Sequence, residues 1–280
     1  MGKSRAPVRP ETRTQLLIEL ARAFGGAVIF ALPLLMTMEM WQLGYSMDPL
    51  RLALLLLLGL PLLLGLSHYG GLRPNRRFVD NLADALATML VAVIAAVAVL
   101  LVLGLVDPGM SVREMVGMVA LQVVPGAIGA ALARSQLSDD EDPQEPDFDP
   151  PSYAGELFIM AAGALFLALN VAPTEEVVLI AFRMSVWNQL GLMAFSLAIM
   201  HAFVYGLGFT GTETTHADDH PVGTFLRFTL VGYALVLAMS LYILWTFGRL
   251  DGLSPHQVTA TTIVLAFPGA IGAAAARLIL

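Results

Sequence analysis

The hydrophobic positions of this chain form long continuous blocks separated by short polar segments. Inside the blocks apolar residues follow one another without the alternation of a half-buried strand, and most blocks approach the about 20 residues that a membrane-crossing helix needs. Because lipid offers no partners for unpaired backbone groups, the blocks predict transmembrane helices. Eight blocks are found, at 24–41, 50–67, 85–106, 115–133, 155–182, 189–209, 229–247 and 258–280.

The same pattern of residues occurs twice along the chain. Residues 125–131 read PGAIGAA and return at 268–274, 143 positions later, and an arginine follows each copy at the same distance (Arg134 and Arg277). Upstream, the stretch from Gly26 to Glu39 matches the stretch from Gly163 to Glu176 at a separation of 137. Tyr69-Gly70 matches Tyr205-Gly206 at a separation of 136, and a seven-residue insertion in the polar segment 207–221 raises the separation to 143. The chain therefore reads as a duplicated hydrophobic module.

Each repeat contains four predicted spans, and an even number returns the chain to its starting side. We therefore expect an all-helical, polytopic membrane protein whose two tandem four-helix repeats are related by a pseudo-twofold axis along the membrane normal. The predicted organisation is a cytoplasmic amphipathic segment at 1–22, a first repeat at 23–135, an acidic cytoplasmic linker at 136–152 and a second repeat at 153–280.

Composition agrees with the membrane prediction. The chain is 57% hydrophobic and 13% charged, where soluble domains carry about 25% charged residues. With the N-terminus inside, eleven lysine and arginine residues fall on the cytoplasmic side and four outside, which predicts that both termini are cytoplasmic. The excess of arginine over lysine is typical of a GC-rich bacterial genome, so we expect the inner membrane of a bacterium.

Several classes of function have no support in the sequence. The absence of cysteine excludes disulfides and thiolate metal sites. No nucleotide-binding, serine-hydrolase or zinc-protease motif is present, so we expect neither an enzyme nor a bound cofactor. The sequence has no basic groove that would indicate binding of nucleic acid. The group His216, Asp218, Asp219 and His220 resembles a metal-ligand cluster, but it lies in the inserted polar segment without a second ligand set and is interpreted as a solvated loop.

Two duplicated glutamates are the main candidates for ion binding or proton relay. Counted along a continuous helix, Glu39 and Glu176 lie about 10 Å inside the outer boundary, where a carboxylate is costly and usually serves a function. The alternative is that both touch water at the interface, or pair with Arg51 and Arg183. Nearby oxygen ligands and helix-opening prolines extend the candidate set to Glu175, Thr37, Thr174, Pro33 and Pro173.

Two histidines could assist a proton relay, because imidazole titrates near neutral pH. His68 and His201 lie at the cytoplasmic ends of the second and sixth predicted spans, although they are not equivalent in the repeat. A structural histidine with satisfied hydrogen bonds is the alternative.

The repeated PGAIGA segments allow helices to approach closely through small residues at every fourth position. They predict tight packing between the two halves, or else broken helices beside a substrate site near the membrane midplane. The residues concerned are Pro125, Gly126, Gly129, Pro268, Gly269 and Gly272.

The paired four-span halves, the repeated PGAIGA segments and the acidic middle linker resemble a family of bacterial integral membrane proteins of unknown function. The resemblance covers most of the chain. It implies a membrane location but no activity, and it assigns no role to any residue.

The leading functional hypothesis is a secondary transporter or channel for a small ion, either a cation or a proton, that uses the duplicated carboxylates. The alternative is a non-transporting scaffold or sensor that binds partners through its cytoplasmic linker. An intramembrane enzyme is a third reading with less support. The expected partners are the lipid bilayer and a small ion; a pathway within one protomer and a pore between the protomers of a homo-oligomer both remain open.

Overall fold

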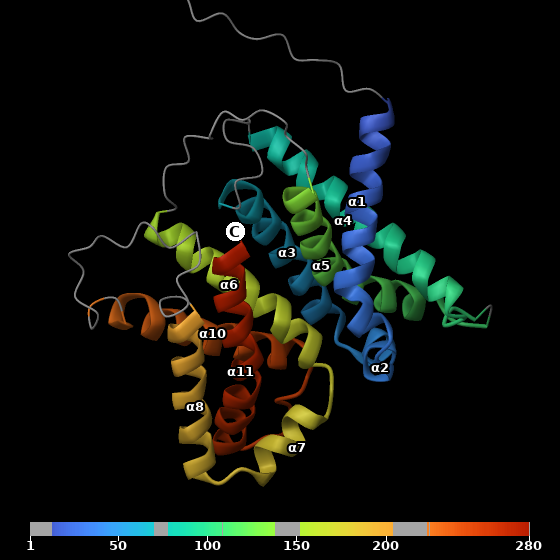
Figure 1. The fold of residues 1–280 in the computed structure, drawn as a ribbon. Coiled ribbons are helices and arrows are strands. Elements are labelled where there is room, and N and C mark those ends of the chain that lie inside the picture. Colours follow the sequence, from blue (N-terminus) through green and yellow to red (C-terminus); the bar gives the residue numbers. More distant parts are fainter. Residues whose placement is uncertain are drawn as a thin grey trace, which may run out of the picture.

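The structure is a computed structural model that describes residues 13–69, 78–107, 109–137, 152–203, 223 and 225–279 (Figure 1). Every regular element in these ranges is a helix, which confirms the predicted all-helical class. The linker 138–151, the insertion 207–221 with its histidine–aspartate group, and the side chain of His68 lie outside the described part of the chain.

Five helices make up the first half of the protein, residues 13–137. They are α1 (Arg13–Leu35), α2 (Met38–Ser46), α3 (Pro49–Tyr69), α4 (Phe78–Val102) and α5 (Val112–Leu137). The helix α5 lies at the centre, where it packs against the other four, and its residues 120–131 are all buried. The predicted amphipathic segment 1–22 is not separate from the first span, because α1 runs without a break from Arg13 into the membrane-spanning part.

The second half, residues 153–279, repeats this arrangement around α11 (Pro255–Ile279). The helices packed against α11 are α6 (Tyr153–Val171), α7 (Glu176–Arg183), α8 (Val186–His201) and α10 (Val231–Thr246). A π-helical turn, η2 (Phe225–Leu230), leads directly into α10. The prediction of four helices per repeat is wrong for the described chain, because the first predicted span of each half is broken into a long and a short helix.

Seven described helices are long and apolar enough to cross a membrane. The predicted block 189–209 contains α8, which has 16 residues, and most of the remaining residues of that block lie outside the described chain. The described part of the chain is therefore that of a multi-pass helical membrane protein, and it contains seven candidate spans. They are Leu17–Leu35, Pro49–Ser67, Phe78–Val102, Val112–Ala133, Tyr153–Val171, Phe225–Thr246 and Pro255–Arg277.

The ends of corresponding helices are built in the same way in the two halves. Ser111 and Glu114 form a capping box at the start of α5, and Ser254 and Gln257 form the matching one at the start of α11. The helices α4 and α10 both end before a glycine with positive φ, Gly104 at 69° and Gly248 at 71°. Matching positions of the sequence repeat therefore have the same local backbone geometry at these helix ends.

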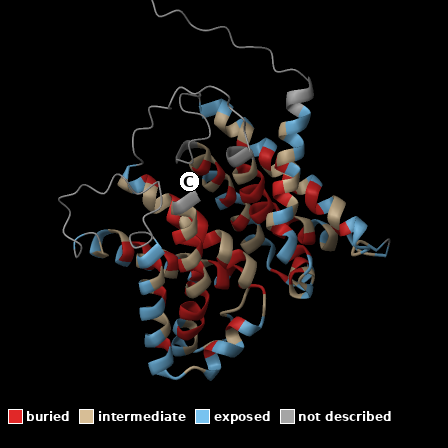
Figure 2. Ribbon diagram, in the orientation of Figure 1, coloured by how far each residue is buried: buried red, intermediate tan, exposed pale blue. Residues whose placement is uncertain are grey.

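The contact between the halves does not follow the predicted twofold relation. A twofold axis that places α3 against α6 and α10 also places α8 against α1 and α4. Within the described residues α3 makes its contacts with α6 and α10, but α8 has no contact of similar extent with α1 or α4. In Figure 2 the buried residues concentrate along the central helices, whereas one side of α8 is largely exposed.

Candidate functional site

The first candidate glutamate follows a break in the chain between α1 and α2. Pro33 lies in the last turn of α1, and Thr37 donates its hydroxyl hydrogen bond to the carbonyl of Pro33. The indole of Trp41 donates to the carbonyl of Leu35 over 2.8 Å, which satisfies a group at the C-terminal end of α1. Glu39 is the second residue of α2 and is half-buried.

The second candidate glutamate follows an equivalent break between α6 and α7. Thr174 donates to the carbonyl of Val171 over 2.9 Å, and Glu175 precedes the first residue of α7, which is Glu176. Arg249 donates to the carbonyl of the buried Pro173 and lies 3.8 Å from the carboxylate of Glu175. Glu176 is exposed.

These breaks remove the continuous helix from which the depth of the two carboxylates was counted. The count of about 10 Å assumed a continuous helix, but Glu39 and Glu176 each sit in the first turn of a new short helix. An acid at that position is favoured by the helix dipole, so these glutamates do not need a buried partner. The predicted pairing with Arg51 and Arg183 is not found, because Arg51 binds Asp251 and Arg183 is exposed at the end of α7.

His201 ends α8 and contacts η2. Its Nδ1 lies 2.9 Å from the hydroxyl of Thr229, which is buried, and its ring packs edge-on against Phe225. The imidazole is far in sequence from both glutamates and joins α8 to the π-helical turn. This geometry agrees with the structural alternative for His201.

The PGAIGA segments do not interrupt their helices. Pro125 lies inside the single helix α5 and Pro268 inside the single helix α11, so the predicted breaks at these prolines are wrong for this structure. The glycines instead allow close packing within each half. A Cβ added to Gly129 would meet the carbonyl of Gly26, and a Cβ added to Gly272 would meet the carbonyl of Gly163.

The second pair of repeat glycines has the same role. Gly126 faces Ala92 and the backbone of Ala27, and Gly269 faces Val236 and the backbone of Ala164. The prediction of tight packing holds, but its location between the halves is wrong, since these contacts join helices of the same half.

An ion pair inside the second half was missed by the sequence reasoning. Arg277 of α11 lies 2.9 Å from the carboxylate of Glu156 in the first turn of α6, and both side chains are less than one-fifth exposed. The repeat contains the signal for this pair, because Glu19 precedes Glu156 by 137 positions and Arg134 precedes Arg277 by 143. The side chain of Arg134 lies outside the described residues.

The two halves are joined by a second ion pair at the end of the molecule that carries α2 and α7, which we call the α2–α7 end. Arg51 of α3 donates two hydrogen bonds to Asp251, of 2.9 and 3.0 Å, and a third of 2.9 Å to the carbonyl of Trp245. Its guanidinium also lies 5.0 Å from the centroid of the Trp245 ring. We refer to the contact of Arg51 with Asp251 and Trp245 as the interhalf clamp.

A polar cavity of about 440 Å³ adjoins this clamp. Residues of both halves line it, with Asp48 and Arg113 from the first half and Thr246 from the second in addition to the clamp. Asp48 is occupied as the N-cap of α3, where it accepts hydrogen bonds from two backbone amides. The α10–α11 connection thus carries both Asp251 of the clamp and Arg249, which binds the α6–α7 break.

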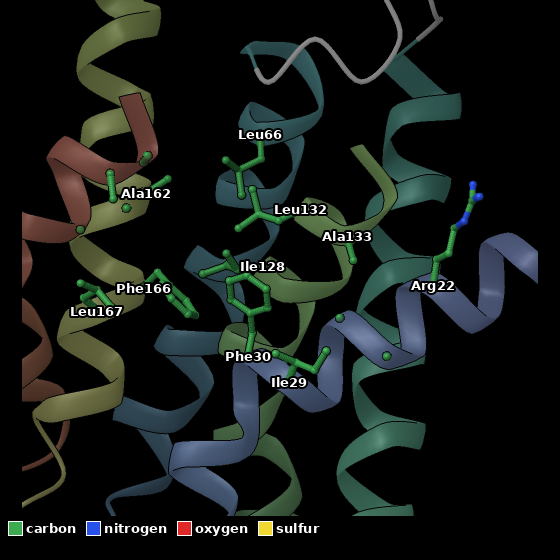
Figure 3. A pocket seen from close by; sticks show the side chains of 16 residues that line it. Arg22, Ile29, Phe30, Leu66, Ile128, Leu132, Ala133, Ala162, Phe166 and Leu167 are labelled. Carbon is green, nitrogen blue, oxygen red and sulfur yellow. The ribbon is translucent and has the colours of Figure 1, made fainter. Parts of the chain in front are cut away.

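A second cavity, of about 550 Å³, lies between the α1–α5 pair and the α6–α11 pair. Figure 3 shows the apolar side chains of Phe30, Ile128, Leu132 and Phe166 around it. The rings of Phe30 and Phe166 meet there with their centroids 5.0 Å apart. Arg22 is the charged residue of the lining. Neither Glu39 nor Glu176 lines either of these two cavities.

Residues 19–280 match a family model with the description "Putative integral membrane protein (DUF2391)". The chain belongs to this family. The resemblance to integral membrane proteins of unknown function is thereby confirmed, and the multi-pass helical architecture agrees with it. Comparison with curated proteins and with solved structures found no match.

Proposed function

We propose that the protein is a secondary transporter for a small ion in which the two halves move against each other. The observation that carries this proposal is the interhalf clamp, because it fastens the halves with charged groups beside a cavity that both of them line. Inside each half the first and the last helix touch through glycines that leave no room for an added Cβ. Rigid halves with a breakable contact at one end suit a rocking motion.

The proposal keeps Glu39 and Glu176 as the groups that bind or relay the ion, assisted by Thr37 and Thr174. Glu39 lies one helical turn before Leu43, which lines the polar cavity, so the two residues share a face of α2. Arg51 and Arg113 line the same cavity, and their positive charges would repel a metal cation. A proton fits better, because a carboxylate can carry it as a neutral acid.

We infer the orientation from the distribution of arginine and lysine. Both termini would face the cytoplasm of a bacterial inner membrane, and the α2–α7 end would face outward. The apolar cavity, lined by later residues of α5 and α11, would then lie nearer the cytoplasmic side. We propose that the two halves share the same internal packing. No twofold relation is proposed for the contact between them.

The proposal is tested by proton flux into proteoliposomes that contain a trapped pH-sensitive dye. The double variant Glu39→Gln, Glu176→Gln is expected to lower the flux by about tenfold or more, since an amide cannot carry a proton. Asp107→Asn is the matched control, because Asp107 is an exposed acid at the same end whose side chain, within the described residues, accepts a hydrogen bond from the backbone amide of Gly109 in its own turn. Equal flux in the double variant and the unaltered protein refutes these site assignments.

A further inference from the structure

The apolar cavity between the halves has a lining that differs from that of an ion pathway. Half of its lining is glycine and alanine, and the rest is leucine, isoleucine and phenylalanine apart from Arg22. Stable water needs two to four polar partners, which such a lining does not supply. The cavity therefore suits a hydrocarbon occupant.

The position of the cavity identifies where that hydrocarbon would come from. The lining residues of α1, α5, α6 and α11 all belong to candidate membrane spans. The surrounding solvent at this depth is the acyl chains of lipids. Its volume of about 550 Å³ is also within the range of about 300–1,000 Å³ that ligand pockets usually have.

The charge at the edge of the cavity indicates which lipid. Figure 3 shows Arg22 at the margin, with its guanidinium directed away from the apolar side chains. Arg277 directly follows Ala276 of the lining on α11. A guanidinium forms two parallel hydrogen bonds to a phosphate, and basic groups beside a cleft between spans are a common feature of anionic lipid sites.

We propose that this cavity holds one acyl chain of an anionic phospholipid, with the lipid phosphate at Arg22. The acyl chain separates the α1–α5 pair from the α6–α11 pair, and the contact between the Phe30 and Phe166 rings forms the floor of the site. The lipid acts as a spacer that keeps the two halves from collapsing onto each other. This site does not depend on the transport of any ion.

The glycines of the chain offer a clean way to block the cavity. Gly25 lines it, and a Cβ placed on Gly25 would meet no other atom within 4 Å, so a larger side chain can enter the cavity without a clash. Gly191 in α8 is the matched control, because it is also helical and also meets nothing within 4 Å, but it does not line the cavity. Both Gly→Leu changes raise helix propensity equally.

The experiment is native mass spectrometry of the detergent-purified protein after delipidation and add-back of phosphatidylglycerol or phosphatidylcholine with identical acyl chains. We expect one retained phosphatidylglycerol in the unaltered protein and in Gly191→Leu, and about tenfold less in Gly25→Leu. Arg22→Gln is expected to remove the preference for phosphatidylglycerol while leaving residual binding of both lipids.

Three results would overturn the proposal. The first is equal phosphatidylglycerol retention by Gly25→Leu and Gly191→Leu. The second is equal retention of both lipids by the unaltered protein, which removes the role of Arg22. The third is a dimer that carries no lipid and that Gly25→Leu dissociates, since a second copy would then fill the cavity. Because no flux is measured, the outcome is independent of the transport proposal.

Discussion

The two halves of the protein agree inside and differ where they meet. In each half a long central helix packs on the first helix through paired glycines. The first helix is followed by a break and a short helix with an acidic first turn. Between the halves, α3 contacts α6 and α10, whereas the described residues of its counterpart α8 make no contact of similar extent with α1 or α4. The described helices thus pack in a similar way inside each half, whereas the contact between the halves involves different helices from each.

One pair of equivalent residues shows how this difference arises. Arg51 and Asn188 both lie three residues after the N-cap of their helix, and each donates its backbone amide to the cap side chain. The side chain of Arg51 crosses to Asp251 in the other half, whereas that of Asn188 accepts a hydrogen bond from its own cap, Ser185. The same backbone position thus serves assembly in one half and only local capping in the other.

The largest expected effect tests whether the internal packing is really shared. Leucine at Gly26 or at Gly163 would force apart helices that touch through backbone carbonyls, so each change should destabilise the protein by about 3 kcal/mol. Thermal unfolding in detergent measures both, and Gly191→Leu, where space is open, should be close to neutral. If only one of the Gly26→Leu and Gly163→Leu changes destabilises the protein, the glycine contacts of the two halves do not contribute equally to stability.

A middle-sized effect tests the difference at the interface. The chain has no cysteine, so Thr246→Cys introduces a single thiol at a fully buried position of the polar cavity. Adding Arg51→Gln should open the clamp and speed labelling by a water-soluble maleimide about tenfold. Asn188→Ala, the same position in the other half, should leave the labelling rate unchanged. An equal rise in both variants would mean that loss of local capping, and not the clamp, controls access.

The smallest effect concerns the shared helix starts. Asp48→Ala and Ser185→Ala each remove an N-cap side chain, and each should cost about 1 kcal/mol in the free energy of unfolding. Ser46→Ala, an exposed serine in α2 that donates only to the carbonyl of Gln42, should change stability by about 0.5 kcal/mol or less. Chemical unfolding in detergent compares the three. A cap change no larger than the Ser46 change would contradict equivalent capping.

Much of the fold was predictable from the sequence. Continuous apolar blocks predicted the long helices, because this signal lies in neighbouring residues of the sequence. Pro33 and Pro173 were interpreted as helix-opening residues, but the predicted spans 24–41 and 155–182 still ran through the breaks that follow Leu35 and Val171. Hydropathy is insensitive to a turn inside an apolar block, and the hydrogen bonds of Thr37, Thr174 and Trp41 that stabilise the breaks are tertiary or side-chain features.

The candidate site was less predictable, because it depends on contacts across the molecule. Glu39 and Glu176 were singled out by counting along a continuous helix, whereas each lies in the first turn of a short helix, and Pro125 was read as a possible break although α5 continues through it. The Arg51–Asp251 pair joins residues 200 positions apart without a duplicated pattern to reveal it. In contrast, the Glu156–Arg277 pair has counterparts in Glu19 and Arg134, so a comparison of charges across the repeat would have found it.

The Glu156–Arg277 pair has a consequence for how the protein is made. The carboxylate enters the membrane at the start of α6, but its cation belongs to α11, which the ribosome delivers 121 positions later, from 156 to 277. At about 5–20 residues per second, that charge waits on the order of ten seconds for its partner. The ion pair can therefore form only after the last helix of the second half has been synthesised, so it fastens α6 to α11 at the end of translation.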